Sequence, residues 1–228
     1  MTKRSKRYTA AAERIDRSQT YAPTEAISIL KELPGAKFDE SVDVVVRLGI
    51  DPRKSDQLVR GAVSLPKGLG KDVTIVVFAE GDKAEAATEA GADHVGSGEL
   101  ADKIAGGWLD FDVVIASPDM MRHVGKLGRV LGPQGKMPSP KSGTVTPDVA
   151  KAVTEFKAGK VEFRTDPGGN VHAPLGKTSF PVADLEANLH AFLEHLGAMR
   201  PAAVKGSFLR RISISTTMGP GAFIHYED

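Results

Sequence analysis

The 228-residue sequence contains no cysteine, and this absence excludes disulfide bonds, thiolate metal sites and cysteine nucleophiles. No run of apolar residues approaches the roughly 20 that a membrane-spanning helix needs. The basic start, MTKRSKRYTAAAERIDR, is not followed by an apolar segment with a cleavage site, so it does not match a secretory signal. Together these absences predict a cytoplasmic protein with no membrane partner.

The net charge is also small, because 30 lysines and arginines nearly balance 29 aspartates and glutamates. The balance nevertheless changes along the chain. Residues 1–67 carry 13 basic against 9 acidic side chains, residues 68–158 carry 10 against 13, and residues 159–228 carry 7 against 7. The flanks therefore have a net charge of +4 and the middle one of −3. This asymmetry favours a polyanion that meets the flanks, although a solvated basic face gives the same count.

The two flanks have the pattern of a mixed helix and strand domain. A helix is expected over 23–33, with proline in its first turn and Pro-Gly after its end. Two strands, 41–50 and 57–65, are expected to pair with each other in antiparallel fashion across the turn-like DPRKSD segment. Further on, a DPGGN turn between KVEFRTD and NVHAPL predicts a hairpin, followed by an amphipathic helix over 181–199 and a last strand.

The middle of the chain has a different pattern, in which strands alternate with helices from Lys71 onward. The expected strands are VTIVVFAE, ADHVG and FDVVIASP, and the helices between them are DKAEAATEAG and GELADKIAGGW. An irregular loop, KMPSPKSGTVTP, precedes a further helix, TPDVAKAVTEFKAG. Strands that alternate with helices at this spacing predict a parallel sheet.

These patterns predict a discontinuous α+β domain, formed by residues 1–67 and 159–228, that is interrupted by an inserted three-layer α/β (Rossmann-like) domain, residues 68–158. Each flank is small for a core of its own, whereas the two together have the length of an ordinary domain. The two crossings between the domains contain Gly68, Gly70 and Gly159. Because glycine tolerates backbone changes that other residues resist, the crossings are predicted to form a hinge.

The last strand lies within KGSFLRRISISTTMGPG and is expected to form an exposed edge of its sheet. Period-two counting places Phe208, Arg210, Ile212 and Ile214 on one side and Leu209, Arg211, Ser213 and Ser215 on the other. The hydroxyl groups that follow one another towards its end suit hydrogen bonding along a sugar-phosphate backbone. Solvated edge positions explain the same residues equally well.

The glycine-rich segments do not match nucleotide-binding loops. Residues 68–70 (GLG) precede a strand instead of following one, and residues 176–178 (GKT) lack the first glycine of a phosphate loop, because Val171 stands there. His190 and His195 are five residues apart on a helix and do not share a face, which argues against a metal pair. The sequence therefore predicts no catalytic residues, no cofactor and no metal. A nucleotide-dependent enzyme that uses the inserted α/β domain remains the alternative.

Several residues of the flanks have the chemistry of a binding surface. Lys37 and Phe38 precede the strand that carries Ser41, and Lys177 and Ser179 lie at the end of another strand. If these strands neighbour the last one, cations, hydroxyls and an aromatic ring share one surface. Such a surface suits RNA, which offers 2′-hydroxyl groups and unstacked bases.

Five sequence blocks carry a resemblance to a known family, and they stand in that family's order: AKFDESVDV, LGIDPRKSDQLVRG, LGPQGKMPSPKSGTV, HAPLGKTSF and STTMGPG. The likeness runs from about Lys6 to Pro220. In these blocks the chain resembles the ribosomal protein L-one family, bacterial type, whose members belong to the mobile stalk beside the tRNA exit site of the large subunit.

The resemblance implies a non-enzymatic constituent of the ribosome whose discontinuous domain binds 23S ribosomal RNA. It also implies contact with deacylated exit-site tRNA during its release, repression of translation from the protein's own operon messenger RNA, and a monomer when free. The positions that match the family's ribosomal RNA-binding residues are Lys37, Phe38, Ser41, Asp166, Lys177, Ser179, Thr217, Met218 and Gly219.

Three positions leave a question open within this resemblance. Asp166 lies in the turn of the expected hairpin, where it either accepts a hydrogen bond from a 2′-hydroxyl group or caps the turn. Gln134 stands where many relatives have arginine, and Ser139 stands where many have asparagine. These two departures put in doubt a phosphate contact by the inserted domain at those positions.

Overall fold

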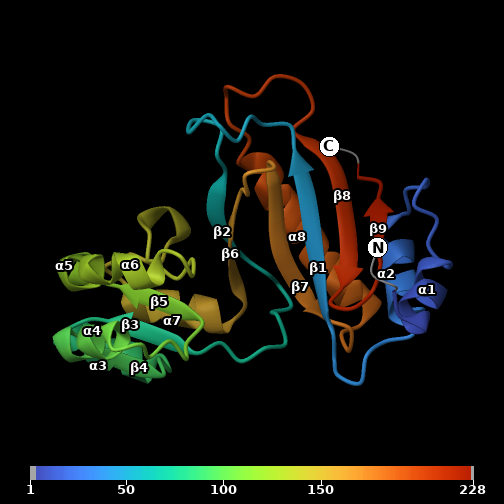
Figure 1. The fold of residues 1–228 in the computed structure, drawn as a ribbon. Coiled ribbons are helices and arrows are strands. Elements are labelled where there is room, and N and C mark those ends of the chain that lie inside the picture. The colour runs from blue at the N-terminus through green and yellow to red at the C-terminus, as the bar shows by residue number, and fades with distance from the viewer. Residues whose placement is uncertain (1–3, 227–228) are drawn as a thin grey trace. The chain divides into compact units, whose positions relative to one another are not determined.

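The computed structural model describes residues 4–226 and contains both helices and strands (Figure 1). The chain divides into two compact units: the first combines Met1–Gly70 with Val161–Asp228, and the second is Lys71–Lys160. The first unit contains α1 (Lys6–Ala12), α2 (Pro23–Glu32), β1 (Ser41–Leu48), β2 (Arg60–Ser64), β6 (Lys160–Arg164), β7 (Asn170–Lys177), α8 (Val182–Ala198), β8 (Leu209–Thr216) and β9 (Gly221–Ile224).

The main sheet of the first unit is built around β1. Its four strands have the order β7-β1-β8-β9, and β1 pairs with both β7 and β8 in antiparallel fashion. Val42, Val44 and Val46 alternate along β1 and are almost completely buried, whereas the residues between them are partly exposed. This period-two pattern is that of a strand with one covered face and one open face.

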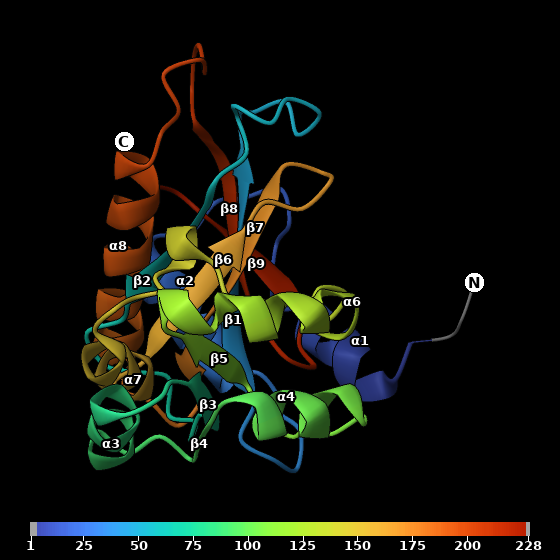
Figure 2. The same cartoon turned by 90° about the vertical axis from the view of Figure 1, so that its left-hand side faces the viewer.

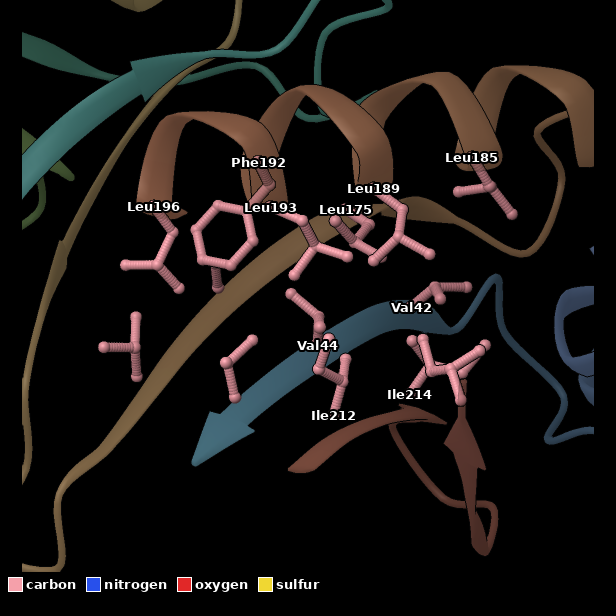
Figure 3. Close-up of a cluster of buried hydrophobic side chains, with 14 of the residues drawn as sticks. Val42, Val44, Leu175, Leu185, Leu189, Phe192, Leu193, Leu196, Ile212 and Ile214 are labelled. Atoms are coloured by element: carbon pink, nitrogen blue, oxygen red, sulfur yellow. The ribbon is translucent and has the colours of Figure 1, made fainter. Parts of the chain in front are cut away.

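Helix α8 lies along the covered face of this sheet (Figures 1 and 2). Leu185, Leu189, Phe192 and Leu196 follow one another at intervals of three or four residues, and none of them is exposed. Figure 3 shows these side chains on the side of α8 that faces β1 and β8. The buried face of the sheet and the apolar stripe of the helix thus form one core.

Two of the strand pairings differ from the prediction. The expected hairpin of strands 41–50 and 57–65 is wrong, because β2 pairs with β6 in a separate two-stranded sheet. The expected hairpin around the DPGGN turn is correct only at the turn, where Thr165 and Val171 form an isolated bridge before β6 and β7 join different sheets. The alternation of a strand does not specify which strand pairs with it. Only a tight turn specifies the pairing from the local sequence.

The expectation that the last strand is an edge is also wrong. β9 follows the Gly-Pro-Gly turn and pairs with β8, so that Ser213 lies opposite Phe223 and Ser215 lies opposite Gly221. The turn closes with a hydrogen bond of 3.2 Å from Gly219 N to Thr216 O. The sequence after the turn, GAFI, is too short to show a period of its own.

The second unit has a three-stranded parallel sheet of order β4-β3-β5, formed by His94–Gly96, Ile75–Phe78 and Val113–Ala116. Ile75 and Val77 pack in one apolar cluster and Val76 and Phe78 in another, so both faces of β3 are covered. The helices and short 3-10 turns of this unit are α3 (Asp82–Glu89), α4 (Gly98–Ala105), η1 (Pro118–Met120), α5 (Met121–Val124), η2 (Gly125–Leu127), α6 (Gly128–Leu131), η3 (Pro140–Ser142) and α7 (Val149–Lys157). Helices on both faces of a parallel sheet give a three-layer arrangement.

The glycines of the two crossings have left-handed backbone conformations. The φ angles of Gly68, Gly70 and Gly159 are 67°, 65° and 110°, a region that residues with a Cβ atom rarely adopt. In addition, the buried side chain of Asn188 accepts from Lys67 N at 3.0 Å and donates to the carbonyl oxygen of Gly68 at 3.0 Å. The start of the first crossing is therefore tied to α8.

Candidate RNA-binding surface

Three of the predicted site residues meet where β1 begins and where β7 and β8 end. Ser41 is the strand partner of Lys177, whose Nζ donates to Ser41 Oγ over 3.1 Å. On the other side, Ser41 N donates to Thr217 Oγ1 at 2.9 Å, and Thr217 N donates to Ser41 O at 3.0 Å. The Thr217 side chain thus takes up a backbone donor at the end of the sheet, as a capping group does.

A buried carboxylate holds two surface loops beside this point. Glu40 Oε1 accepts from Ala36 N at 2.6 Å and its Oε2 accepts from Met218 N at 2.8 Å, while Arg7 Nη1 lies 3.7 Å from Oε1. Burial alone would raise the pKa of Glu40, but the hydrogen bonds from Met218 and Ala36 outweigh it and lower the pKa. Glu40 is therefore charged at neutral pH and fixes the positions of both loops.

The two loops present apolar side chains to the solvent. Phe38 is 55% exposed and Met218 is 51% exposed, so neither side chain belongs to the core. Lys37, next to Phe38, is exposed as well. An exposed aromatic ring and a polarisable thioether beside lysines offer stacking, apolar contact and phosphate binding within one surface.

Gly219 belongs to the same loop and has a steric reason to be glycine. A Cβ atom at this position would lie 2.3 Å from Thr216 Oγ1, a distance at which one of the two groups must move. A side chain at position 219 would therefore require either Thr216 Oγ1 or the loop after β8 to shift.

Ser179 lies beside this cluster but is engaged within the protein. Its hydroxyl donates to Asp39 Oδ2 over 2.7 Å, and Thr178 Oγ1 donates to Asp39 Oδ1 over 2.8 Å. The hydrogen bond from Ser179, followed by that from Thr178, lowers the pKa of Asp39. Sequence reasoning missed Asp39 and Glu40, because a carboxylate before a strand looks like an ordinary solvated residue.

Asp166 lies away from the Ser41 cluster. β7 starts at Asn170, opposite Arg47, and ends at Lys177, opposite Ser41, so the turn that carries Asp166 is at the opposite end of the strand pair. Asp166 Oδ1 accepts from Gly168 N at 2.8 Å and from Asn170 N at 2.7 Å. The capping alternative accounts for these contacts, and the exposed side chain of His172 lies with its Nε2 3.2 Å from Asp166 Oδ2.

The pKa of Asp166 predicts how the stability of this turn depends on pH. Burial would raise the pKa, but hydrogen bonds from Asn170, His172 and Gly168 lower it from 3.8 to about 2. A lowered folded-state pKa contributes stability above the unfolded value, and the contribution disappears as the pH falls to about 2. We therefore expect Asp166→Asn to unfold at lower urea concentration than wild type at pH 7, with the difference vanishing at about pH 2. An equal difference at both values would contradict this role.

Among residues 4–226 no group of three or more histidine, aspartate or glutamate side chains could hold a metal ion. No helix in that range is long and apolar enough to cross a bilayer.

In the second unit, Ser139 is buried and its backbone N donates to Thr144 Oγ1 over 2.8 Å, whereas Gln134 is exposed.

Comparison with known proteins identifies the class of protein. The model of the ribosomal protein L1p/L10e family matches residues 30–220, and the chain belongs to this family. This confirms the resemblance carried by the five sequence blocks. The family is one of ribosomal proteins and not of enzymes, so the alternative of a nucleotide-dependent enzyme is set aside.

Close relatives cover almost the whole chain. The large ribosomal subunit protein uL1 of Nocardioides sp. is 60% identical over 218 residues, which are 96% of this chain and 91% of the relative. The protein of the same name from Bordetella pertussis is 58% identical over 222 residues, or 97% and 96% of the two chains. That from Kosmotoga olearia is 54% identical over 227 residues, or 100% and 98%.

Proposed function

We propose that this chain is a structural constituent of the large subunit of the cytoplasmic ribosome and binds 23S ribosomal RNA at the mobile stalk through its first unit. The observation that carries the proposal is the cluster around Ser41, where Glu40 holds the loops of Phe38 and Met218 beside Lys177 and the end of β8. Phe38 and Met218 are large, exposed and apolar, so they are available for contact with RNA bases.

The proposed RNA-binding surface comprises the residues of this cluster together with those that match the family pattern: Lys37, Phe38, Ser41, Asp166, Lys177, Ser179, Thr217, Met218 and Gly219. Its chemistry favours RNA, because exposed hydroxyls and backbone groups at the end of a sheet can bond to 2′-hydroxyls, while Phe38 and Met218 contact bases. The Ser179 hydroxyl donates to Asp39, and Thr217 Oγ1 accepts from Ser41 N and donates to Ser41 O over 3.4 Å, so each hydroxyl oxygen still has a lone pair that can accept a hydrogen bond from RNA.

Two further activities belong to the same proposal. The family membership supports contact with the deacylated tRNA that leaves the exit site and repression of translation from the protein's own messenger RNA. Repression requires only that the messenger contain a structure similar to the ribosomal site, because one surface then binds both. We further propose that the free protein is a monomer and that its units rotate about the crossings at Gly68, Gly70 and Gly159.

The proposal assigns RNA binding to the first unit and so predicts the result of deleting the second unit. A chain in which residues 1–67 are joined to residues 159–228 through a short glycine-serine linker should keep most of the affinity for a stalk ribosomal RNA fragment, because every proposed contact lies in these residues. Residues 71–160 alone serve as the control and should not bind the fragment. Filter binding measures both, after circular dichroism has shown that each chain is folded. Loss of binding by the folded joined chain would refute the assignment.

A further inference from the structure

The main sheet of the first unit has an open face as well as the face covered by α8. In Figure 1 no helix formed by the described residues of this unit lies in front of β1 and β8. Period-two alternation puts six side chains of β1 and β8 on this face beyond the Ser41 cluster: Asp43, Val45, Arg47, Arg211, Ser213 and Ser215. The face runs from Ser41 at one end of β1 to Arg47 near the other, about 20 Å at the usual rise of a strand.

Two arginines lie directly opposite each other at the far end of this face. Arg47 of β1 and Arg211 of β8 are Cα partners in the antiparallel register, and both are exposed. Among residues 4–226, no carboxylate lies within 4 Å of either guanidinium. The guanidinium of Arg211 lies over the ring of Phe223 at 4.9 Å, which restricts its orientation.

Such an arrangement destabilises the free protein. Like charges at directly opposite positions of an antiparallel pair repel each other, whereas opposite charges there attract. Asp43 is the one carboxylate on the paired strands of this face, and it lies four residues from Arg47, about 13 Å along β1. An anion that accepts hydrogen bonds from both guanidinium groups would turn the repulsion into attraction.

We propose that Arg47 and Arg211 form a clamp for one backbone phosphate of the RNA that binds at the Ser41 cluster. The inference rests on the function proposed above and adds a second site to it. The clamp lies next to Asn170, the partner of Arg47 on β7, and Asn170 Nδ2 donates to Asp166 Oδ2 over 3.0 Å. The Ser41 cluster and the turn of Asp166 lie at opposite ends of the β1–β7 pair, and the open face runs from one to the other.

The test compares Arg47→Gln, Arg211→Gln and the double variant with Arg210→Gln in the full-length chain. Arg210 is the matched control, because it is an exposed arginine next to Arg211 on the opposite side of β8. We expect each clamp variant to bind the stalk RNA fragment about 10- to 50-fold more weakly in filter binding. The slope of affinity against salt should fall by about 0.7 to 0.9, the value for one phosphate.

Two further measurements separate the clamp from a structural role. The double variant should bind little more weakly than either single variant, because both arginines hold the same phosphate. Arg47→Gln should not lower the thermal unfolding midpoint of the free protein, because it removes a charge that faces a like charge, whereas Arg211→Gln also removes the contact with the Phe223 ring. Affinity that stays at the wild-type level in both clamp variants, while Met218→Asp weakens binding, would overturn the clamp and leave the proposed function intact. Wild-type protein that does not bind the fragment would overturn the proposed function itself.

Discussion

Met218→Asp is expected to lower the affinity for the stalk ribosomal RNA about 30- to 150-fold, the range of a hot-spot residue. The side chain of Met218 is 51% exposed, so its replacement does not disturb the core and should remove only the contact proposed with the RNA. The new carboxylate adds repulsion, because it would stand among phosphate groups. Filter binding of the full-length variant to the fragment measures the loss.

The control for this variant keeps the apolar character of the side chain. Met218→Leu has a similar volume and no charge, and we expect it to bind within about threefold of wild type. Circular dichroism and thermal unfolding should show no difference among the three proteins. If Met218→Asp bound the RNA as tightly as wild type did, the loop after β8 would not belong to the binding surface.

Glu40→Ala is expected to lower both stability and RNA affinity. The substitution leaves Ala36 N and Met218 N without their acceptor in a partly buried place, and an unsatisfied donor costs about 1 to 3 kcal/mol. We expect the free energy of unfolding of the first unit to fall by about 2 to 4 kcal/mol. The amide of Met218 should also exchange its hydrogen faster, which mass spectrometry or NMR can follow.

Glu40→Gln separates the shape of this side chain from its charge. Glutamine keeps one acceptor oxygen, so it can hold one of the two backbone donors but not both. Its stability and RNA affinity should therefore lie between those of wild type and Glu40→Ala. Amides of the second unit, such as that of Val114, serve as the internal reference and should not change. Equal exchange of the Met218 amide in all three proteins would show that Glu40 does not hold the loop.

The helices and strands of the fold could be predicted from the sequence far better than the pairing of the strands. The apolar stripe of α8 and the alternation along β1 and β8 result from local spacing, which a sequence displays directly. The pairing of β1 with β7 and β8 depends on which arrangement covers the valines of β1, and no short segment contains that information. The hairpin expected between strands 41–50 and 57–65 is wrong for this reason, and the hairpin expected around the DPGGN turn is correct only at the turn.

The candidate site was predicted in part, for a similar reason. Residue types and the family resemblance indicated Ser41, Lys177 and Thr217, and the structure brings these three together. Neither source indicated Glu40, because its role depends on the convergence of two loops that are far apart in the sequence. The pair of Arg47 and Arg211 likewise exists only through the register of β1 and β8.

The central place of β1 also has a consequence for the order in which the chain folds during its synthesis. Residues 41–48 leave the ribosome early, yet their partners, 170–177 and 209–216, follow more than about 120 residues later. The second unit, Lys71–Lys160, is continuous and can complete its own core in the meantime. Closing so long a loop costs little stability but slows the pairing. The unit proposed to bind RNA is therefore the last part to form, only when the final strands have emerged.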